Sequence, residues 1–309
     1  MKIIFIGTPQ FGAIILEGLA RNNYKPVLVI TAPDKPVGRK QILTPSEVKK
    51  LARKYNIPII QPQKIENCEL EIENLRPDLI ISASYGQIIP KEILKIPKYG
   101  SLNVHPSLLP KYRGPSPIQQ AILNGDKKTG ITIYLMDEKI DHGPIISDLQ
   151  FPISKKFNYQ ELKKELAELG LKLLLKTIPK WTNDEIKSKP QDESKASYTK
   201  IIKKEDGKID WSKSADEIER QIRAFYPWPG TFTFWNKKRL KILEADVSKP
   251  SDNKNYSLGE TFFSDKKLLV SCGRNFLIIK KLQLEGKRTT NAEEFLKGHS
   301  DFIGAILSN

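Results

Sequence analysis

Cysteine, histidine and methionine are scarce in this chain of 309 residues, which has two cysteines, three histidines and two methionines. Cys68 and Cys272 lie far apart and neither stands in a paired spacing, which excludes a disulfide framework and a zinc ribbon. The remaining candidate ligands, His105, His142 and Asp141, also lack zinc-like spacing, so we expect no metal. Unpaired cysteines are typical of a reducing compartment, and we expect a cytoplasmic protein.

Long apolar runs are missing as well. No stretch approaches the roughly 18 apolar residues that a membrane span needs. The N-terminal stretch MKIIFIG has one lysine and a short apolar run that ends at Gly7. That run is too short for the hydrophobic region of a signal peptide, and an Arg- and Ser-rich transit peptide is not apparent either. We therefore expect no membrane partner.

Two common loop motifs of enzymes are absent. The stretch GTPQFGA, residues 7–13, follows a strand-like run but matches neither G-x-G-x-x-G nor a loop ending in G-K-[ST]. Ser107 does not lie in a G-x-S-x-G motif, which argues against a serine hydrolase. We therefore expect the residues of an active site in other segments of the chain.

Charge of one sign is in excess. The chain has 51 Lys and Arg against 36 Asp and Glu, a net charge of +15, and the basic residues occur along its whole length. A single basic stretch is often only solvated surface, whereas an excess over the whole chain favours a polyanionic partner.

The first half alternates strand-like and helix-like stretches, which predicts an α/β fold with a Rossmann-like, mostly parallel sheet. The strand-like runs are KIIFIG, PVLVIT, IPII, DLIISAS and SLNVH. The stretch TPSEVKKLARKY opens with Thr44, Pro45 and Glu47, which predicts a helix capped by Thr44. After Gly130, ITIYLM and GPIISDLQF are joined by DEKIDH, which predicts a hairpin at the end of the sheet.

The second half has a different pattern. Several short strand-like runs, among them TFTFW, RLKILEADV, KLLVSC and FLIIKKLQL, predict a small β-barrel. Before them lies a polar stretch with little apolar periodicity. We therefore predict a catalytic domain over 1–189, a linker over 190–208, and a C-terminal barrel domain over 209–309.

Ligands of open α/β sheets bind outside the carboxyl ends of the strands. Asn103 and His105 stand two apart at such an end, so their side chains point to the same side. A structural Asn–His pair that bonds nearby backbone is the alternative. Asp141 lies in the predicted hairpin turn, where an aspartate usually bonds its own backbone. Its role depends on whether the turn reaches His105, which the sequence leaves open.

The motif NVHPSLLP over 103–110, followed by Arg113-Gly114 and by Asp141-x-Gly143, resembles the signature of the folate-dependent formyltransferases. Similarity to this family covers nearly the whole chain, from IGTPQFG through PDKPVGRK and SYGQIIP to AFYPWPGTFT and QLEGKRTTNAEEFLKG. Among its branches, the resemblance is greatest to members that formylate methionyl initiator tRNA. Pro106 stands where glycine is also common in the family. His142 stands where a small residue or threonine often follows the aspartate.

The resemblance implies a C-terminal barrel of OB-like type and formyl transfer from 10-formyltetrahydrofolate to the amino group of methionyl initiator tRNA. Asn103, His105 and Asp141 match the family's catalytic trio. The residues implied to contact folate are Ser107, Leu108, Leu109 and Pro110, with Tyr85, Gly86 and Gln87 on a neighbouring loop. We expect a monomer in a bacterial cytosol.

Basic residues in two regions are candidates for tRNA contact. The loop from Asp34 to Lys40 follows the second predicted strand, and the resemblance implies that it enters the acceptor stem. The alternative interpretation of this segment is a solvated surface loop. The candidates of both regions are Lys35, Arg39, Lys40, Lys237, Lys238, Arg239, Lys280 and Lys281. An amino-sugar nucleotide formyltransferase using the same donor is the alternative function.

Overall fold

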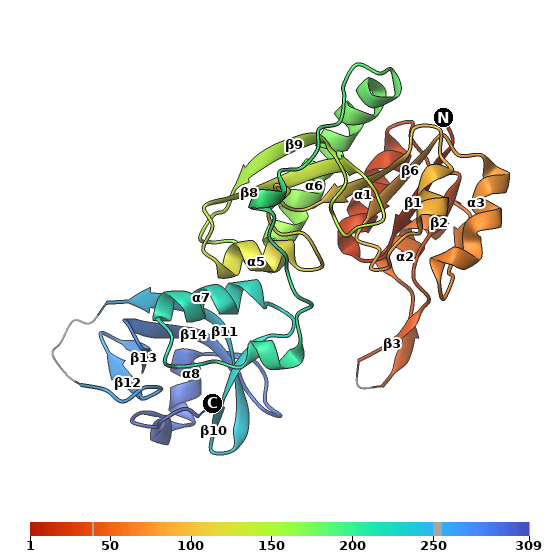
Figure 1. The fold of residues 1–309 in the computed structure, drawn as a ribbon. Helices are drawn as coiled ribbons and strands as arrows, with labels where there is room; N and C mark the ends of the chain where they lie inside the picture. Colours follow the sequence, from red (N-terminus) through yellow and green to blue (C-terminus); the bar gives the residue numbers. More distant parts are fainter. Residues whose placement is uncertain (39, 250–254, 309) are drawn as a thin grey trace. The chain divides into compact units, whose positions relative to one another are not determined.

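The computed structural model of the chain describes residues 1–38, 40–249 and 255–308 (Figure 1). The chain divides into two compact units. Unit 1 comprises Met1–Pro117, Lys128–Pro152 and Leu162–Lys200. Unit 2 comprises Ile118–Lys127, Ile153–Glu161 and Ile201–Asn309. The helices, in chain order, are α1 (Gln10–Arg21), α2 (Glu47–Lys54), α3 (Glu69–Leu75), α4 (Lys91–Lys95), α5 (Pro117–Leu123), α6 (Tyr159–Thr182), α7 (Ala215–Ala224) and α8 (Ala292–Lys297).

The main sheet of unit 1 has the order β5-β2-β1-β6-β7-β8-β9. Its strands are β1 (Ile3–Gly7), β2 (Leu28–Ile30), β5 (Ile59–Ile60), β6 (Leu79–Ala83), β7 (Ser101–His105), β8 (Lys128–Leu135) and β9 (Ile145–Pro152). Pairing is parallel from β5 to β7, and β8 and β9 then add an antiparallel hairpin. The predicted Rossmann-like, mostly parallel sheet is confirmed.

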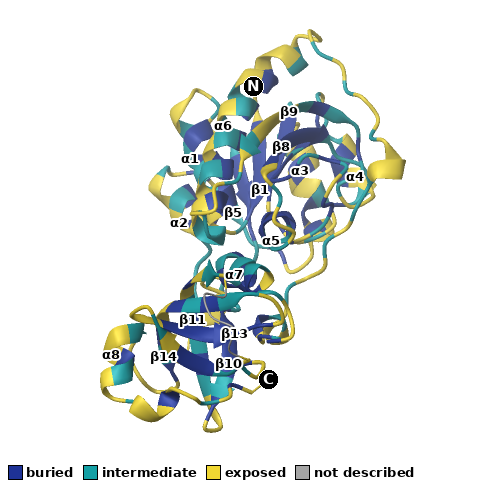
Figure 2. Ribbon diagram, turned by 90° about the vertical axis from the view of Figure 1, so that its left-hand side faces the viewer, coloured by how far each residue is buried: buried dark blue, intermediate teal, exposed yellow. Residues whose placement is uncertain are grey.

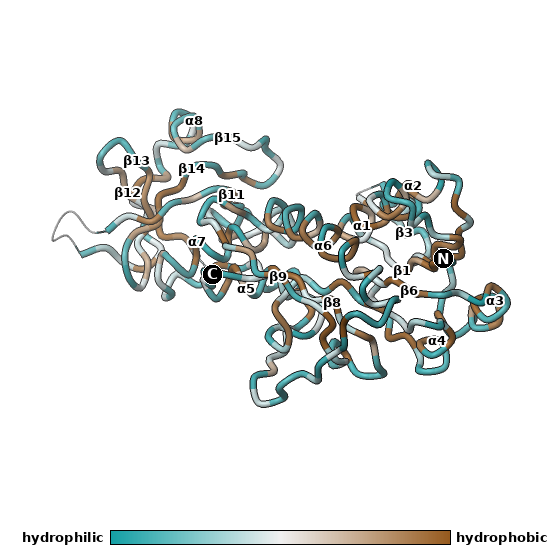
Figure 3. Tube along the Cα trace, turned by 90° about the horizontal axis from the view of Figure 1, so that it is seen from above, coloured by the Kyte–Doolittle hydropathy of each residue, from teal (hydrophilic) through white to brown (hydrophobic). Residues whose placement is uncertain are grey.

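Both faces of this sheet are buried, as its continuous apolar strands require. Ile4 and Ile6 of β1 join a core cluster with residues of α3 and α4 on one face. On the other face, Gly170 of α6 packs directly on Val104 of β7 and close to Ile15 of α1. A Cβ at Gly170 would approach Val104 to 2.9 Å, so this contact requires glycine. Figure 2 shows buried strands beneath partly exposed helices, and Figure 3 shows the hydrophobic residues along β1 and β6.

The predicted basic loop is largely a β-hairpin, which projects from the body of unit 1 in Figure 1. Strands β3 (Lys35–Val37) and β4 (Ile42–Thr44) form it, and Arg39 lies outside the described residues. At its base, Asp34 accepts hydrogen bonds from Lys49 Nζ at 2.7 Å and Gln61 Nε2 at 2.8 Å. The hydrogen bond from Lys49 lowers the pKa of Asp34, so the base is held by an ionised carboxylate.

The N-cap of α2 was predicted at Thr44, and that prediction is wrong. Thr44 belongs to β4, where it pairs with Lys35. Ser46 caps the helix instead, because its hydroxyl accepts a hydrogen bond from Lys49 N at 3.0 Å and lies 2.9 Å from the hydroxyl of buried Thr31. Because Thr44 pairs within the hairpin, the helix begins two residues later than predicted.

Unit 2 contains an antiparallel sheet in the order β10-β11-β14-β13-β12, with β15 paired to β14. Its strands are β10 (Thr231–Trp235), β11 (Lys238–Ser248), β12 (Thr261–Ser264), β13 (Lys267–Ser271), β14 (Phe276–Leu284) and β15 (Thr290–Asn291). The last residues of the chain connect its two edges: Ser308 pairs with Phe234 of β10, and Ile306 pairs with Glu260 beside β12. This closure gives the predicted small barrel.

The core of this barrel is covered by helix α7. Ile218 and Ile222 of α7 pack with strand residues such as Leu240 and Ile279. The capping box of Ser214 and Glu217 is present, with reciprocal hydrogen bonds between side chain and backbone.

The segment predicted as a linker divides between the units. Residues 190–200 belong to unit 1, and the rest belongs to unit 2. Within unit 1, Arg113 N donates to Ser197 O at 2.8 Å and Thr199 N donates to Arg113 O at 2.8 Å. The segment's first part is therefore paired to the loop that follows β7.

Along the described residues, no helix is long and apolar enough to cross a membrane.

We predict that Ser46→Ala lowers the free energy of unfolding by about 1 kcal/mol, because it removes the N-cap of α2. Thr44→Ala is the matched control and should change it by less than about 0.5 kcal/mol, as expected for a surface substitution. Chemical denaturation of both variants measures the difference. A larger decrease in the free energy of unfolding for Thr44→Ala than for Ser46→Ala would show that Thr44 is the N-cap.

Candidate active site

The loops after the parallel strands meet at one edge of the sheet of unit 1. Thr8, just after β1, donates its backbone N–H to Ser84 O after β6 at 3.2 Å. Its hydroxyl accepts a hydrogen bond from Ala32 N after β2 at 3.3 Å. These loops therefore converge, and β7 ends at the same edge because it pairs in parallel with β6.

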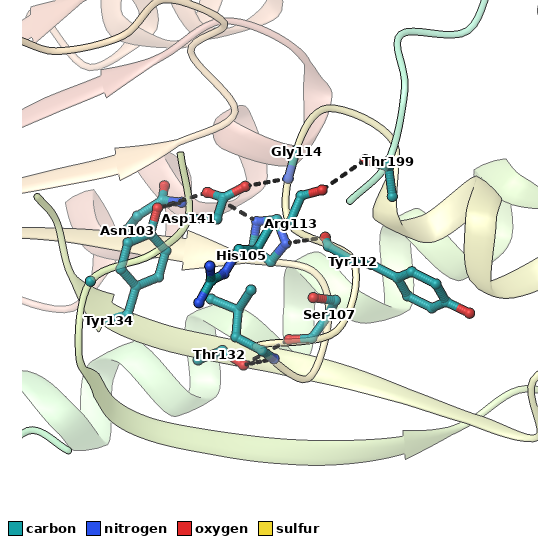
Figure 4. Close-up of polar contacts among 12 residues, drawn as sticks. Asn103, His105, Ser107, Tyr112, Arg113, Gly114, Thr132, Tyr134, Asp141 and Thr199 are labelled. Atoms are coloured by element: carbon teal, nitrogen blue, oxygen red, sulfur yellow. Dashed lines mark hydrogen bonds and ion pairs between the residues drawn. The ribbon is translucent and has the colours of Figure 1, made fainter. Parts of the chain in front are cut away.

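Asn103 and His105 lie side by side at the end of β7 (Figure 4). The register with the antiparallel strand β8 places Tyr134 opposite Asn103 and Thr132 opposite His105. Asn103 Nδ2 donates to the Tyr134 hydroxyl at 3.2 Å. Asn103 keeps partial exposure, whereas His105 is only 4% exposed.

The backbone around His105 contacts one of its two ring nitrogens. Nε2 lies 3.0 Å from the carbonyl oxygen of Tyr112, which can only accept a hydrogen bond. Nε2 therefore carries a proton in this contact, and Nδ1 is the other ring nitrogen. That nitrogen faces the Asp141 carboxylate, with Nδ1 and Oδ1 3.5 Å apart.

Asp141 comes from the turn between β8 and β9, and the structure brings it to His105. Its Oδ1 accepts a hydrogen bond from the Tyr134 hydroxyl at 2.7 Å, and its Oδ2 accepts one from Gly114 N at 2.6 Å. The predicted turn aspartate thus bonds groups far from its own backbone. Asn103, Tyr134, Asp141 and His105 form a continuous polar group at this edge (Figure 4).

Tyr134 is the member of this group that the sequence prediction missed. Burial, reinforced by the charge of Asp141, raises the pKa of Tyr134 well above its usual value, so the phenol stays protonated and donates to the carboxylate. The signal for Tyr134 was available only through strand register, since its position opposite Asn103 follows from the pairing of β7 with β8.

The residues predicted to contact folate after β7 form a tight loop. Ser107 is fully buried, and its hydroxyl donates to Lys111 O at 2.6 Å. Thr132 Oγ1 donates to Ser107 O at 2.7 Å and accepts from Leu109 N at 3.0 Å. Leu108 packs over Gly130, and Pro110 is partly exposed. The Ser107 hydroxyl and the Leu109 amide thus hold the loop, leaving other atoms of 107–110 for a ligand.

The neighbouring loop after β6 contains Tyr85, Gly86 and Gln87. Gly86 is exposed, adopts φ +89°, and has open space where a Cβ would lie. The Gln87 side chain accepts from Ile65 N at 3.0 Å and donates to Gln63 O at 3.2 Å, which fixes a neighbouring loop. Tyr85 is buried, and this burial raises its pKa to about 12.

The predicted tRNA-contact residues differ in their surroundings. Lys35 and Lys40 are exposed in the hairpin region of unit 1. In unit 2, Lys237 and Lys238 are exposed, and the Arg239 guanidinium lies over the Phe232 ring at 4.1 Å.

Two lysines of β14 are already paired with carboxylates of β11. Lys280 Nζ lies 2.6 Å from Asp246, and Lys281 Nζ lies 2.8 Å from Glu244. These two carry less uncompensated charge than Lys237 and Lys238. Within the described residues, no group of three or more His, Cys, Asp or Glu is arranged to hold a metal ion.

Both halves of the chain match models of known protein families. The family model described as Formyl transferase matches residues 1–178, and the model described as Formyl transferase, C-terminal domain matches residues 201–300. A methionyl-tRNA formyltransferase of Halalkalibacterium halodurans is 44% identical over 99% of this chain and 98% of its own length. Another, of Caldicellulosiruptor saccharolyticus, is 43% identical over the full length of both chains.

Solved structures give a more distant likeness. An N-formyltransferase of Helicobacter canadensis, in complex with folinic acid and dTDP-3-aminofucose, is 26% identical with a TM-score of 0.68, and covers 90% of this chain and 98% of its own. The sugar 3N-formyl transferase WlaRD, in the presence of dTDP and 5-N-formyl-THF, is 25% identical with a TM-score of 0.66, and covers 93% and 99%. Because its relatives match it over their full length and the family models match both of its halves, this chain belongs to the formyl transferase family.

Proposed function

We propose that this protein transfers the formyl group of 10-formyltetrahydrofolate to the amino group of methionyl initiator tRNA, acting as a monomer in the cytosol. The product is N-formylmethionyl-tRNA for translation initiation. The observation that carries the proposal is the cluster of Asn103, His105 and Asp141, in a chain whose full-length relatives are methionyl-tRNA formyltransferases.

A nucleotide-amino-sugar formyltransferase with the same donor is the second candidate. The two structural neighbours solved with dTDP or a dTDP-linked amino sugar favour it. Their identity to this chain is 25–26%, against 43–44% for the methionyl-tRNA relatives, and the net charge of +15 suits a polyanionic acceptor better.

The reaction is a direct acyl transfer between two nitrogens. The neutral amine attacks the formyl carbon, a tetrahedral oxyanion forms, and the bond from that carbon to the folate nitrogen breaks as this nitrogen takes up a proton. A free α-amino group titrates at about 7.7–8.0, and an aminoacyl ester lowers that value, so a usable fraction is neutral at pH 7. Positioning two reactants supplies roughly 7–11 kcal/mol, so no covalent enzyme intermediate is required.

Asn103 supplies a hydrogen-bond donor to the developing oxyanion. Its amide is held by the Tyr134 hydroxyl and keeps partial exposure at the edge where the strands end. One such donor is typically worth about 2.7–4 kcal/mol. The Tyr134 contact fixes the amide in place before the substrate arrives, so little reorganisation is needed during the reaction.

His105 and Asp141 handle the proton of the attacking amine. Nδ1 of His105 accepts it, directly or through water, since Nε2 is already protonated toward Tyr112 O. The imidazolium that forms is stabilised by Asp141 Oδ1, 3.5 Å from Nδ1, and can donate to the oxyanion or return a proton to the departing folate nitrogen.

Three sets of residues are proposed to hold the substrates. In the proposal, residues 107–110 and the loop of Tyr85, Gly86 and Gln87 hold folate at the carboxyl edge of the sheet. Lys35, Arg39 and Lys40 of the predicted basic loop contact the tRNA acceptor stem. Lys237, Lys238, Arg239, Lys280 and Lys281 of unit 2 contact its phosphates.

The proposal is tested by supplying 10-formyltetrahydrofolate together with methionyl initiator tRNA, an amino-sugar nucleotide, or water alone. We expect rapid formylation of the tRNA and little reaction in the other two mixtures. Preferential formylation of the amino sugar would establish the second candidate, and hydrolysis alone would exclude both.

We predict that Asp141→Asn lowers kcat about 100-fold or more, because the amide cannot stabilise a protonated His105. The amide oxygen can still accept from Gly114 N, so the fold and the affinity for folate should be retained. Steady-state kinetics and folate titration measure both effects. Asp148→Asn, at an exposed position of β9, is the matched control for the removed charge. Turnover of Asp141→Asn within a few-fold of wild type would remove Asp141 from the mechanism.

We predict that replacing Lys237, Lys238 and Arg239 together by alanine weakens tRNA binding and flattens its dependence on salt. The slope should change by about 1 for each phosphate that these side chains no longer neutralise. The variant Lys280→Ala/Lys281→Ala should do less, because Asp246 and Glu244 already neutralise these lysines. Filter binding over a series of salt concentrations measures both. Equal effects of the two variants would contradict this ranking.

A further inference from the structure

Gln191 lies in the segment that the sequence presents only as a polar connection, yet its side chain contacts the main chain of the catalytic turn. Its Nε2 donates to Asp141 O at 2.9 Å and to Gly143 O at 2.8 Å. Its Oε1 accepts from Arg113 Nε at 3.1 Å and from Arg113 Nη2 at 2.8 Å. The amide thus joins the turn of Asp141 to the loop that follows β7.

Arg113 is a rigid support for this amide. It is fully buried, and its guanidinium also donates to both carboxylate oxygens of Glu193 and to the Tyr198 hydroxyl. The hydrogen bond to Glu193 holds the pKa of Arg113 above its usual value, so the charge is permanent. Its backbone is paired on both sides with Ser197 and Thr199.

Asp141 needs such support because its backbone is in an unfavourable region. Its φ is +50°, in the left-handed region that non-glycine residues occupy only when their surroundings stabilise it. Tyr134 and Gly114 hold the carboxylate at its two oxygens, but these two hydrogen bonds do not reach the main chain of the turn. Gln191 holds the carbonyl oxygens on either side of His142, and so restrains the turn itself.

We propose that Gln191 is a positioning residue for formyl transfer, which holds the Asp141 turn so that the carboxylate faces His105 Nδ1. This inference rests on the proposed function, since it assigns Gln191 to the reaction of that site. Gln191 acts through Asp141 and does not touch the substrates. Displacing a catalytic group by about 1 Å costs about 100-fold in rate, so removing this restraint should lower kcat about 10- to 100-fold.

The test uses Gln191→Glu, which keeps the shape and the acceptor for Arg113 but has no donor for Asp141 O and Gly143 O. Gln191→Ala removes the whole amide, and its melting temperature shows whether it still folds. Ser194→Ala is the matched control, because Ser194 is exposed in the same segment and its hydroxyl bonds Asp192. We expect Gln191→Glu to lower kcat about 10- to 100-fold, with KM for folate and for tRNA within about threefold of wild type, and its melting temperature to stay above the assay temperature.

A double-mutant cycle separates positioning from a general structural role. If Gln191 acts through Asp141, then Gln191→Glu should cost less than about threefold in a protein that already has Asp141→Asn. A full additional decrease in that background, or unchanged kcat in Gln191→Glu alone, would overturn the inference while leaving the proposed function in place. An inactive wild type in the same assay would overturn the proposed function, and the inference with it.

Discussion

The structure of this site depends on one contact, between the Asp141 carboxylate and Nδ1 of His105. Each partner is fixed from the other side. His105 Nε2 is committed to Tyr112 O, so the ring presents Nδ1 to the carboxylate. Asp141 accepts from Tyr134 at Oδ1 and from Gly114 N at Oδ2, and these two hydrogen bonds hold Oδ1 beside the ring. In the proposed reaction, a proton accepted by His105 therefore arrives beside a negative charge that is already held in place.

Three parts of the chain that are distant in sequence must meet for this contact to exist. The parallel sheet brings the end of β7 to the ligand-binding edge, and the antiparallel strand β8 brings Tyr134 beside Asn103. The turn after β8 then carries Asp141 back over the sheet. Gln191, from the segment 190–200, is proposed to hold that turn in its left-handed conformation. The geometry of the proposed catalytic site thus depends on the topology of the sheet more than on any local motif.

Much of the fold was predictable, because buried parallel strands are continuous apolar runs and their order follows from alternation with helices. Asn103 and His105 could be named because residues two apart at a strand end share a side. Tyr134 needed the register of β7 with β8, and Gln191 gave no signal, because a polar segment without periodicity carries no information about what it packs against. The cap of α2 was misplaced since Thr44 and Ser46 are chemically equivalent caps, and only the hairpin pairing of Thr44 separates them.

The central claim is that His105 keeps a proton on Nε2 toward Tyr112 O and uses Nδ1, beside Asp141, to accept the proton of the amine, and nitrogen-15 NMR of the imidazole rings tests it most directly. Variants His142→Gln and His299→Gln assign the remaining signals to His105. We predict that neutral His105 carries its proton on Nε2, and that Asp141→Asn shifts the Nδ1 signal most. A neutral ring with its proton on Nδ1 would contradict the account, because that nitrogen could not then accept a proton from the amine.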